Sequence, residues 1–373
     1  MINIRYENQN IPDDLALHVK ADKTLHNYFS MDFDGIKPNN YCGFLHVNNQ
    51  EYFIVPKIST NEDKNLDIFI YMLMHAYDIK LSNEHLANFT DTKYRFLEIF
   101  IRYFSDKLLQ EFKKGVFKKY ITLEDNLKVL RGKYLCEKNF TNFYHQNIYC
   151  EYDEFSMDNE LNRFFLYAIK VFKKFSSYPN LSRCEVILDE VNFLHVDINR
   201  SHINFDRMNS RYKHSYDLAI MILNKLIPLP SKSDTQSFAF LFKMSEVFEN
   251  FIGKIYQDID SSTKLQVEKN FGNLKLKPDI VTRDLIIDTK YKKINSKDDL
   301  KASDKYQMFA YGTNFEIKDT MLLYPKHLLH VDEDLELGKG EKMIKLKIKT
   351  IDLDSEKEFD EYVDEIKNRL EEV

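Results

Sequence analysis

Glycine is scarce in this chain, with nine residues among 373. None of them lies in a Gly-x-x-x-x-Gly-Lys-Ser/Thr or Gly-x-Gly-x-x-Gly pattern, the two glycine-rich loops that cradle the phosphates of nucleotides. The chain is therefore not expected to bind or hydrolyse a nucleotide by either route. Any nucleotide hydrolysis linked to it would come from a partner protein.

Cysteines and long apolar runs are also few. The four cysteines show no Cys-x-x-Cys spacing, which indicates neither a zinc site nor a disulfide framework. The longest uncharged apolar run, Ile68 to Met74, is well short of the roughly 18 residues that span a bilayer. The first residues lack a basic-then-apolar signal pattern. We expect a cytoplasmic protein that makes no membrane contact.

The net charge of −6 is unevenly distributed. Residues 350–373 hold ten acidic and three basic residues, a net of −7, which leaves +1 for residues 1–349. Residues 101–140 hold ten basic and five acidic residues, a net of +5. Local basic segments matter more for phosphate binding than the total charge, so DNA is not excluded as a partner. The alternative is that these bases form a solvated helix face.

Two short strands are predicted near the end of the chain, Leu274–Val281 and Leu285–Tyr291, joined by a tight turn at residues 283–284. Successive side chains of a strand point to opposite faces. Asp288 and Lys290 therefore share one face of the second strand. This hairpin is the stretch in which residues that can carry chemistry are most concentrated.

The register of the hairpin decides which of these residues meet. A two-residue turn pairs Val281 with Ile286 and Asp279 with Asp288. Directly opposed residues share a face, with Cβ atoms roughly 4.5–5.5 Å apart, so two carboxylates would lie side by side with Lys290 one step along. Such like charges repel, and a divalent cation held between them would offset the repulsion. Because Arg-Asp is not a favoured tight-turn pair, a slipped register is the alternative.

The sequence Pro278-Asp279, a short gap and Asp288-x-Lys290 resemble the signature of the PD-(D/E)xK nucleases. The tripeptide alone is a weak signal, and its alternative is a surface hairpin with a solvated ion pair. The apolar residues 285–287 that precede Asp288 favour a buried strand with a polar end.

Two further elements resemble that superfamily. A helix is predicted over Phe238–Ile259, and nucleases of this class take another carboxylate from a helix that precedes the hairpin. The resemblance implies that Glu249, rather than Glu246, supplies it. After the hairpin, Gln307 and Tyr311 lie one helical turn apart and resemble the Gln-x-x-x-Tyr motif of RecB-like members, whose glutamine helps to place DNA or the metal.

Three motifs precede this core in a fixed order: Gly115–Tyr120, Leu130–Lys133 and Tyr152–Arg163. Together with a hairpin predicted at Asn40–Ile58, they resemble the McrC family, the nuclease subunits of McrBC-type modification-dependent restriction systems. The resemblance covers about residues 40–325.

The residue patterns and the resemblance predict a multidomain protein of mixed α+β or α/β class. We expect a β-rich N-terminal domain at residues 1–62, a helical partner-docking region at 63–150, and a PD-(D/E)xK nuclease domain at 151–373 with a mixed sheet flanked by helices. Apolar spacing predicts helices from residue 63 onward and at Phe96–Gly115, Asn162–Phe175, Met208–Ile227 and Ser355–Leu370, and strands at Thr320–Tyr324 and Met343–Leu353. Ser355 and Glu358 form a predicted capping box for the last helix.

The resemblance implies an endodeoxyribonuclease that depends on Mg²⁺ or Mn²⁺. The implied catalytic residues are Asp279, Asp288, Lys290, Glu249 and Gln307. The implied metal ligands are Asp279, Asp288, Glu249 and the carbonyl of Thr289. A bound metal would neutralise the phosphate and acidify water, and Lys290 would place a cation beside the nucleophile.

The resemblance also implies a partner, an McrB-like hexameric AAA+ GTPase ring that reads modified double-stranded DNA, so that GTP enters only through it. Lys118, Lys119, Arg131 and Tyr311 are candidates for contact with the ring or DNA, although Arg131 alone reads as a basic turn. Two other functions stay open. One is an activating subunit whose nuclease fold is vestigial. The other is a stand-alone RecB-like nuclease, which would leave the first 150 residues unexplained.

Overall fold

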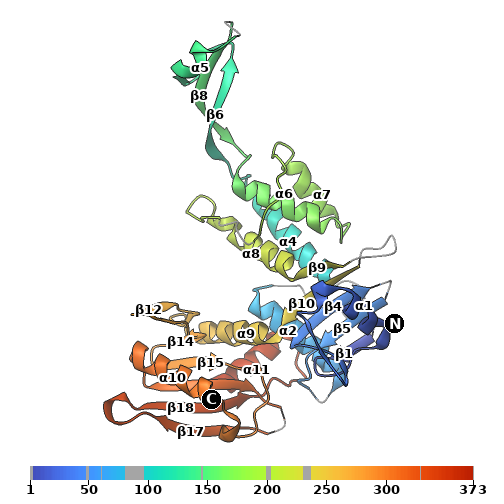
Figure 1. Ribbon diagram of the computed structural model, residues 1–373, viewed down its shortest axis with the longest axis vertical. Coiled ribbons are helices and arrows are strands. Elements are labelled where there is room, and N and C mark those ends of the chain that lie inside the picture. Colours follow the sequence, from blue (N-terminus) through green and yellow to red (C-terminus); the bar gives the residue numbers. More distant parts are fainter. Residues whose placement is uncertain are drawn as a thin grey trace. The chain divides into compact units, whose positions relative to one another are not determined.

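The computed structural model describes residues 3–47, 50–59, 61–79, 96–143, 146–198, 203–229, 237–327 and 329–372. The chain divides into two compact units, and Figure 1 follows it through both by colour. Unit 1 consists of Met1–Asp91 and Ile227–Val373, and unit 2 of Thr92–Leu226. This division does not follow the three segments expected from the sequence, because the boundary expected at residue 150 falls inside strand β8 (Ile148–Ser156).

The N-terminal part of unit 1 is built on a five-stranded sheet with the order β1-β5-β4-β10-β9. Its strands are β1 (Asn3–Tyr6), β4 (Tyr41–Val47), β5 (Gln50–Val55), β9 (Leu226–Leu229) and β10 (Ser237–Lys243). Strands β4 and β5 pair antiparallel, which confirms the predicted hairpin, while its turn at residues 48–49 lies outside the described residues. Between β1 and β4 the chain forms α1 (Asp13–Ala21), β2 (Phe29–Asp32) and β3 (Gly35–Pro38).

Strand β10 corrects an expectation from the sequence. The prediction of one helix over Phe238–Ile259 is wrong, because Ser237–Lys243 form β10 and helix α9 (Met244–Ile259) begins only afterwards. Strand β10 pairs antiparallel with β4, with Leu241 opposite Gly43. A short, continuously apolar run fits a buried strand as well as a buried helix, so periodicity does not separate them. Pairing with a strand about 200 residues earlier decides the conformation here.

The C-terminal part of unit 1 holds a six-stranded sheet with the order β11-β14-β15-β16-β18-β17. The strands β15 (Leu285–Thr289), β16 (Asp319–Pro325) and β18 (Ile344–Ile351) run parallel. The strands β11 (Lys264–Leu265), β14 (Ile280–Val281) and β17 (Asp332–Leu337) pair antiparallel with their neighbours. The strands predicted at 320–324 and 343–353 are thus confirmed as β16 and β18. A separate small hairpin joins β12 (Lys269–Phe271) to β13 (Leu274–Leu276).

The predicted hairpin is present in a shortened form. Val281 pairs with Ile286, as predicted for a two-residue turn, and the turn is closed by a hydrogen bond from the Thr282 N–H to the Leu285 carbonyl (2.9 Å). The expected first strand, Leu274–Val281, is instead split into β13 and β14. Pro278 lies in the break between them, where its missing N–H and fixed φ interrupt a ladder.

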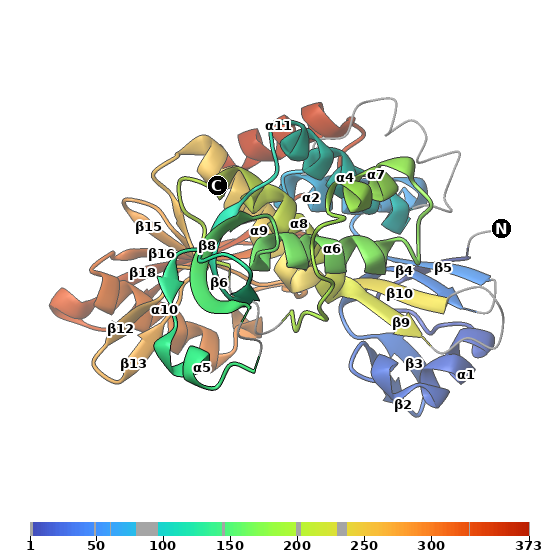
Figure 2. The same cartoon turned by 90° about the horizontal axis from the view of Figure 1, so that it is seen from above.

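Helices enclose this sheet. Helix α10 (Ala302–Phe315) forms a buried apolar cluster with the strands, to which Met308, Ile286, Leu322 and Ile348 contribute. Helices α2 (Glu62–Ala76), α9 and α11 (Phe359–Glu371) pack against one another. Figure 2 shows α10 and α11 on opposite sides of the sheet. The helix predicted from residue 63 onward is confirmed as α2.

Helix α11 begins later than predicted. It starts at Phe359, and its N-cap residue Glu358 makes no side-chain cap hydrogen bond. The predicted capping box is therefore wrong. The hydroxyl of Ser355 donates instead to the Glu365 carboxylate (2.5 Å) and accepts from the Lys357 N–H (3.1 Å), so it closes the turn before the helix.

Unit 2 contains a helical bundle of α4 (Phe96–Lys113), α6 (Glu160–Phe172), α7 (Pro179–Ile187) and α8 (Lys213–Lys225). The helices predicted at 96–115, 162–175 and 208–227 are confirmed in α4, α6 and α8 with shifted ends. Aromatic side chains fill the bundle, and the rings of Phe104 and Phe172 lie 5.2 Å apart between centroids. Aromatic spacing in this part of the sequence thus reports packing.

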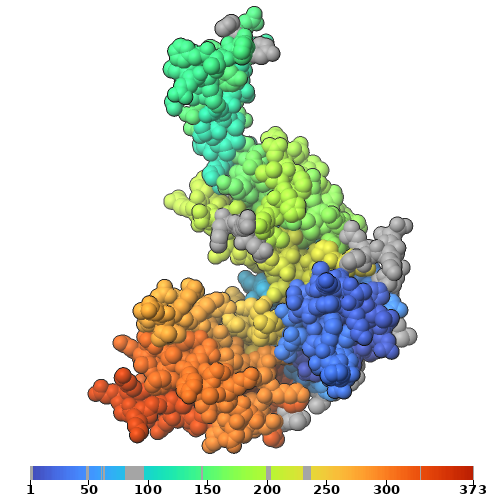
Figure 3. Space-filling view, viewed as in Figure 1, coloured from blue at the N-terminus to red at the C-terminus, as the bar shows by residue number. Residues whose placement is uncertain are grey.

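An arm, defined here as residues 119–156, extends from this bundle. It consists of β6 (Lys119–Leu127), β7 (Lys133–Tyr134), α5 (Cys136–Phe140) and β8, in the sheet order β6-β8-β7. Figure 3 shows it in teal and green as a narrow projection of unit 2. The expectation of a helical region at 63–150 is therefore wrong for the arm, whose strands hold each other by a nine-residue ladder.

The described chain has the mixed α/β class predicted, with sheets and helices in both units. None of the helices in the described ranges is long and apolar enough to cross a bilayer.

Candidate active site

The carboxyl end of β15 brings together three predicted site residues. Nζ of Lys290 lies 2.6 Å from Oδ2 of Asp288 and donates to Oε1 of Gln307 (3.2 Å). The Gln307 amide in turn donates to Oδ1 of Asp288 (3.1 Å). Asp288 is buried, with only 2% of its surface exposed. Each member of this triangle is therefore oriented by the other two, and the carboxylate and ammonium lie on one face of β15 as predicted.

Tyr311 fixes the glutamine. Its hydroxyl accepts a hydrogen bond from the Gln307 amide (2.8 Å) and donates to the Lys277 carbonyl (3.0 Å). Gln307 and Tyr311 are one turn apart on α10, so both reach the same strand end. Tyr311 thus holds Gln307 in position, and its contact with the ring or DNA stays a prediction.

Asp279 lies directly before β14 and next in line after the Ile280–Ile287 pair, which is the place expected for a residue opposite Asp288. Its Oδ2 accepts hydrogen bonds from the N–H (2.8 Å) and the hydroxyl (2.9 Å) of Thr289. Sequence reasoning assigned Thr289 only a carbonyl role. Its side chain instead orients Asp279.

Of the two candidate carboxylates on α9, Glu249 is the one near the aspartates. The charges of Asp279 and Asp288 act on Glu249, and its Oε1 accepts a hydrogen bond from the Gln266 amide (2.5 Å). Glu246 lies one turn earlier on α9 and is exposed. Its charge contributes to the raised pKa values of Tyr41 and Tyr77. The structure therefore brings Glu249, and not Glu246, to the two aspartates.

Burial and mutual repulsion oppose ionisation of these carboxyl groups. Burial, followed by the charge of Asp279, raises the pKa of Asp288 to about 6. The same two causes raise the pKa of Glu249 to about 7. Burial also raises the pKa of Asp279, against the opposing effect of the Thr289 hydrogen bonds. Burial is the largest effect on Lys290 and lowers its pKa, but the charge and hydrogen bond of Asp288, together with the charges of Asp304 and Asp279, outweigh it, so this pKa is raised.

The chemistry of these donors suits a hard divalent cation, which prefers carboxylate oxygens. Oδ2 of Asp288 is buried and lies 2.6 Å from the Lys290 ammonium. In the part of the chain that the structure describes, no three His, Cys, Asp or Glu side chains form a ready-made metal cluster. Lys290 now provides the positive charge nearest to Asp288.

Sequence reasoning missed Gln266. This residue follows β11, has a positive φ of 49°, and donates its N–H to the Asp279 carbonyl (2.8 Å) while its amide reaches Glu249. Gln266 therefore connects the backbone of Asp279 to the side chain of Glu249 by hydrogen bonds. No local pattern marks it, because its role depends on the pairing of β11 with β14.

The other predicted contact residues lie in unit 2. Lys118 and Lys119 are exposed beside the start of the arm, and Lys119 lies 3.5 Å from Glu160. Arg131 is within the arm, 3.2 Å from Glu154, with its guanidinium over the Tyr152 ring. The structure thus places Arg131 in local contacts of the arm.

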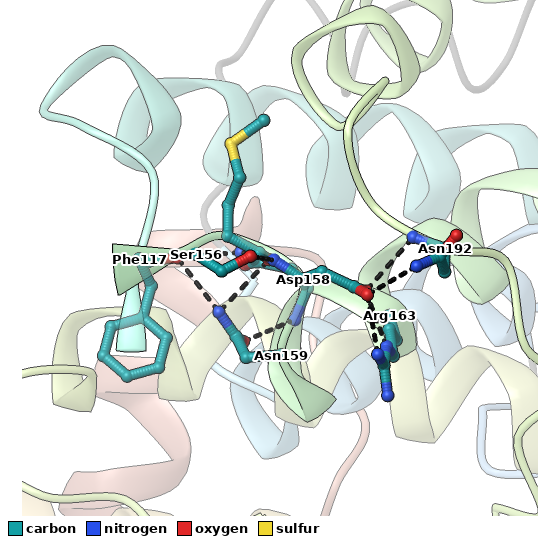
Figure 4. A network of polar contacts seen from close by, with 8 residues as sticks. Phe117, Ser156, Asp158, Asn159, Arg163 and Asn192 are labelled. Carbon is teal, nitrogen blue, oxygen red and sulfur yellow. Dashed lines mark hydrogen bonds and ion pairs between the residues drawn. The ribbon is translucent and has the colours of Figure 1, made fainter. Parts of the chain in front are cut away.

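A polar network fixes the base of the arm (Figure 4). Arg163 makes two hydrogen bonds to Asp158 (2.6 and 2.7 Å), and Asn192 adds two more to the same carboxylate. Asn159 and the buried Asn162 both donate to the Phe117 carbonyl. The Asn162-Arg163 pair therefore joins the end of β8 to the start of β6 and is not a solvated helix surface.

Comparisons with known proteins agree with this architecture. The model of the McrBC 5-methylcytosine restriction system component family matches residues 36–325. No curated protein matches the chain. The fold resembles a chain of a refined half-complex from a tetradecameric assembly of Thermococcus gammatolerans McrB AAA+ hexamers with bound McrC, with 20% identity, a TM-score of 0.59 and full coverage of both chains.

A cryo-EM structure of the Thermococcus gammatolerans McrBC complex also matches, with 23% identity and a TM-score of 0.49 over 69% of this chain and 87% of that chain. The family model covers well over half of the chain. The protein therefore belongs to the family of McrBC 5-methylcytosine restriction system components.

Proposed function

We propose that this chain is the DNA-cleaving subunit of an McrBC-like restriction system, with a PD-(D/E)xK nuclease core in unit 1. The observation that carries the proposal is the buried Asp288 held between Lys290 and Gln307, beside the carboxylates of Asp279 and Glu249. Burial of like charges raises the free energy of the folded state, so such groups are found mainly where function requires them.

The residues divide the work of phosphodiester hydrolysis. Asp279, Asp288 and Glu249, with the Thr289 carbonyl, would hold Mg²⁺ or Mn²⁺, which supplies charge neutralisation of the phosphate and acidification of water when bound. Lys290 would place its positive charge beside the charge that develops on the phosphate. Gln307 keeps Asp288 oriented, Tyr311 keeps Gln307 in place, and Thr289 does the same for Asp279.

The partner in this proposal is an McrB-like AAA+ GTPase ring acting on modified double-stranded DNA. A structurally similar chain comes from an assembly of McrB AAA+ hexamers with bound McrC. The arm of unit 2 supports a docking role, because it exposes large apolar side chains such as Phe140 (90% exposed) and Phe143 (93%). Exposed apolar groups gathered on one element favour a protein contact. GTP would then act only through the partner.

The test is Lys290→Ala in the complex reconstituted with the partner, with DNA cleavage and GTP hydrolysis measured on the same sample. Cleavage should fall by about 10²–10³-fold or more, which is typical for loss of one preorganised charge. GTP hydrolysis should persist, because Lys290 lies in unit 1 and the arm in unit 2.

The matched control is Lys342→Ala. This exposed lysine lies in the β17–β18 turn, at the opposite end of the sheet from the carboxyl end of β15. Unchanged cleavage in Lys290→Ala would favour an activating subunit with a vestigial nuclease core. Loss of both activities would show that the two functions are not separable between the units.

A further inference from the structure

A cavity lies within unit 1, lined in part by the three residues that follow Lys290. Its volume is about 410 Å³. The ends of four strands line it: Tyr6–Gln9 after β1, Lys57 and Ile58 after β5, Tyr291–Lys293 after β15, and Pro325–His327 after β16. Parallel strands β15 and β16 thus direct their carboxyl ends into it. In open α/β sheets, that edge is where ligands bind.

The lining is strongly basic. Its cationic or potentially cationic side chains are Lys57, Lys292, Lys293, Lys326 and His327. Two of these lysines are neutralised, Lys292 by Asp304 (2.7 Å) and Lys326 by Asp352 (2.5 Å). Among the described residues, no salt bridge involves Lys57 or Lys293, and the Lys57 ammonium lies over the Tyr6 ring, 5.6 Å from its centroid. A net positive charge therefore remains in the cavity.

The charges of Lys57 and Lys293 both act on His327. Burial lowers the pKa of His327, and the charges of Lys293 and Lys57 lower it further. Both ammonium groups are therefore close enough to act on one imidazole. Both the lining of the cavity and this shared effect on His327 place the Lys57 and Lys293 ammonium groups near each other.

The one carboxylate in the lining, Glu7, offsets only part of this charge: the charge of Lys293 acts on Glu7, and one carboxylate faces two lysines. Glu7 is 4% exposed and accepts a hydrogen bond from the Tyr291 hydroxyl (2.7 Å). Burial raises the pKa of Glu7 to about 6, against the lowering effect of that hydrogen bond. Its role is internal: it ties the end of β1 to the residue that follows Lys290.

The position of the cavity limits what it can bind. Tyr291 follows Lys290 directly, and the Lys292 N–H donates to the Lys290 carbonyl (3.0 Å). The basic lining therefore continues the chain segment that carries the candidate catalytic lysine. A polyanion held at Lys290 by one phosphate would place a neighbouring phosphate toward these lysines.

We infer that this cavity is a phosphate anchor for the DNA strand, engaging a backbone phosphate next to the one that is cleaved. This inference rests on the proposed nuclease function and names the part of the substrate that the cavity holds. Lys57 and Lys293 supply the charge, and the neutralised Lys292 and Lys326 supply N–H donors. Contacts of this kind position DNA without reading its sequence.

The experiment is DNA binding by the full chain in EDTA, followed by fluorescence anisotropy of a labelled duplex over a range of salt concentrations. The variant is Lys57→Gln with Lys293→Gln. Loss of two phosphate contacts should weaken binding uniformly across sequences and reduce the slope of log K against log salt by about 2. The charge-conserving pair Lys57→Arg with Lys293→Arg should retain both affinity and slope.

The matched control is Lys339→Gln with Lys342→Gln, two exposed lysines in the β17–β18 turn. An affinity and slope for the cavity variant equal to those of this control would overturn the inference. So would a wild-type chain without measurable affinity for DNA at low salt. Calorimetry with inorganic phosphate separates the remaining case: phosphate binding lost in the cavity variant with DNA affinity unchanged would mean a small-anion site and not a DNA anchor.

Because cleavage plays no part in the binding measurement, failure of the anchor proposal can be told apart from failure of the nuclease proposal. A chain whose Lys290→Ala variant still cleaves would refute the active site and leave the binding result standing. A chain that loses cleavage through Lys290→Ala but binds DNA independently of Lys57 and Lys293 would refute only the anchor.

Discussion

At the scale of single residues, the candidate site is defined by carboxyl groups that oppose one another. Asp288 and Glu249 have raised pKa values because burial and the charge of Asp279 both disfavour their ionised forms. Hydrogen bonds from Gln307, Gln266 and the Thr289 backbone hold the three groups in place despite this cost. A site arranged in this way gains from any cation that enters it.

The pH dependence of stability follows from these shifts. Glu249 has a folded pKa of about 7, raised above its unfolded value, so its contribution to stability is fully present below the unfolded pKa. That contribution is lost as the pH rises through about 7. We expect the melting temperature of the cation-free wild type, relative to Glu249→Gln, to fall between pH 5 and pH 8. Glutamine suits this comparison because its Oε1 still accepts from Gln266.

Thermal melts in EDTA across this pH range provide the measurement, and repetition with Mg²⁺ adds a second arm. Bound cation should reduce the difference, because it stabilises the ionised carboxylates. Glu246→Gln, one turn away and exposed, is the control and should follow the wild-type profile. Parallel profiles for the wild type and Glu249→Gln would show that the repulsion is absent.

At the scale of elements, strand β10 connects the five-stranded sheet of unit 1 to the helix that carries Glu249. It continues directly into α9, the helix that carries Glu249, and it pairs with β4. The two backbones approach closely at Gly43, whose φ of +143° is disfavoured for other residues. A Cβ added there would lie 2.1 Å from the Phe240 carbonyl oxygen. The start of α9 therefore depends on a glycine far away in the sequence.

Gly43→Ala should consequently destabilise unit 1 strongly. The clash is with backbone atoms of Phe240 and Leu241 in β10, so a shift of the β4–β10 ladder is required, and the loss should exceed about 2 kcal/mol. Thermal or urea unfolding of Gly43→Ala and of the wild type measures this loss of stability. Gly272→Ala is the matched control: Gly272 also has a positive φ (60°), but nothing lies within 4 Å of its added Cβ. Its cost should stay near 1 kcal/mol. Equal losses in the two variants would contradict a close approach at Gly43.

At the scale of the whole molecule, the chain separates the candidate chemistry from the candidate docking element. The carboxylates, Lys290 and the basic cavity belong to unit 1, and the arm belongs to unit 2. The network at Asp158, Asn162 and Arg163 holds the two ends of the arm together on the bundle. A partner that grips the arm would therefore act on unit 2 as one body.

Reversal of the positive charges at Lys118, Lys119 and Arg131 to glutamate should weaken assembly with the partner or engagement of its DNA. The fold of unit 2 should survive, because all three side chains are exposed. The readouts are complex formation, GTP hydrolysis and cleavage by the reconstituted complex, with circular dichroism as a check on folding. Lys174→Glu, exposed beyond the end of α6, is the control. Unchanged rates in the triple variant would identify these bases as a solvated face.

Local patterns in the sequence were sufficient for the hairpin and for the helical pair at the site. The Val281–Ile286 register follows from a two-residue turn, and the period of two then aligns Asp279 with Asp288. The spacing of Gln307 and Tyr311 on one helical face likewise needs nothing beyond the helix itself. Each of these relations is set by the geometry of one element or one turn, which a sequence states directly.

Tertiary structure decided the relations that join distant segments. Residues 237–243 became a strand because β4 was available to pair with them, and Gln266 reached Glu249 because β11 pairs with β14. Tyr291 meets Glu7 across 284 positions of sequence. Backbone hydrogen-bonding groups must find partners when they are buried, and an apolar run does not specify which distant strand provides them. The sequence alone thus determined which residues could perform the chemistry, and only the tertiary structure determined which distant residues hold them in place.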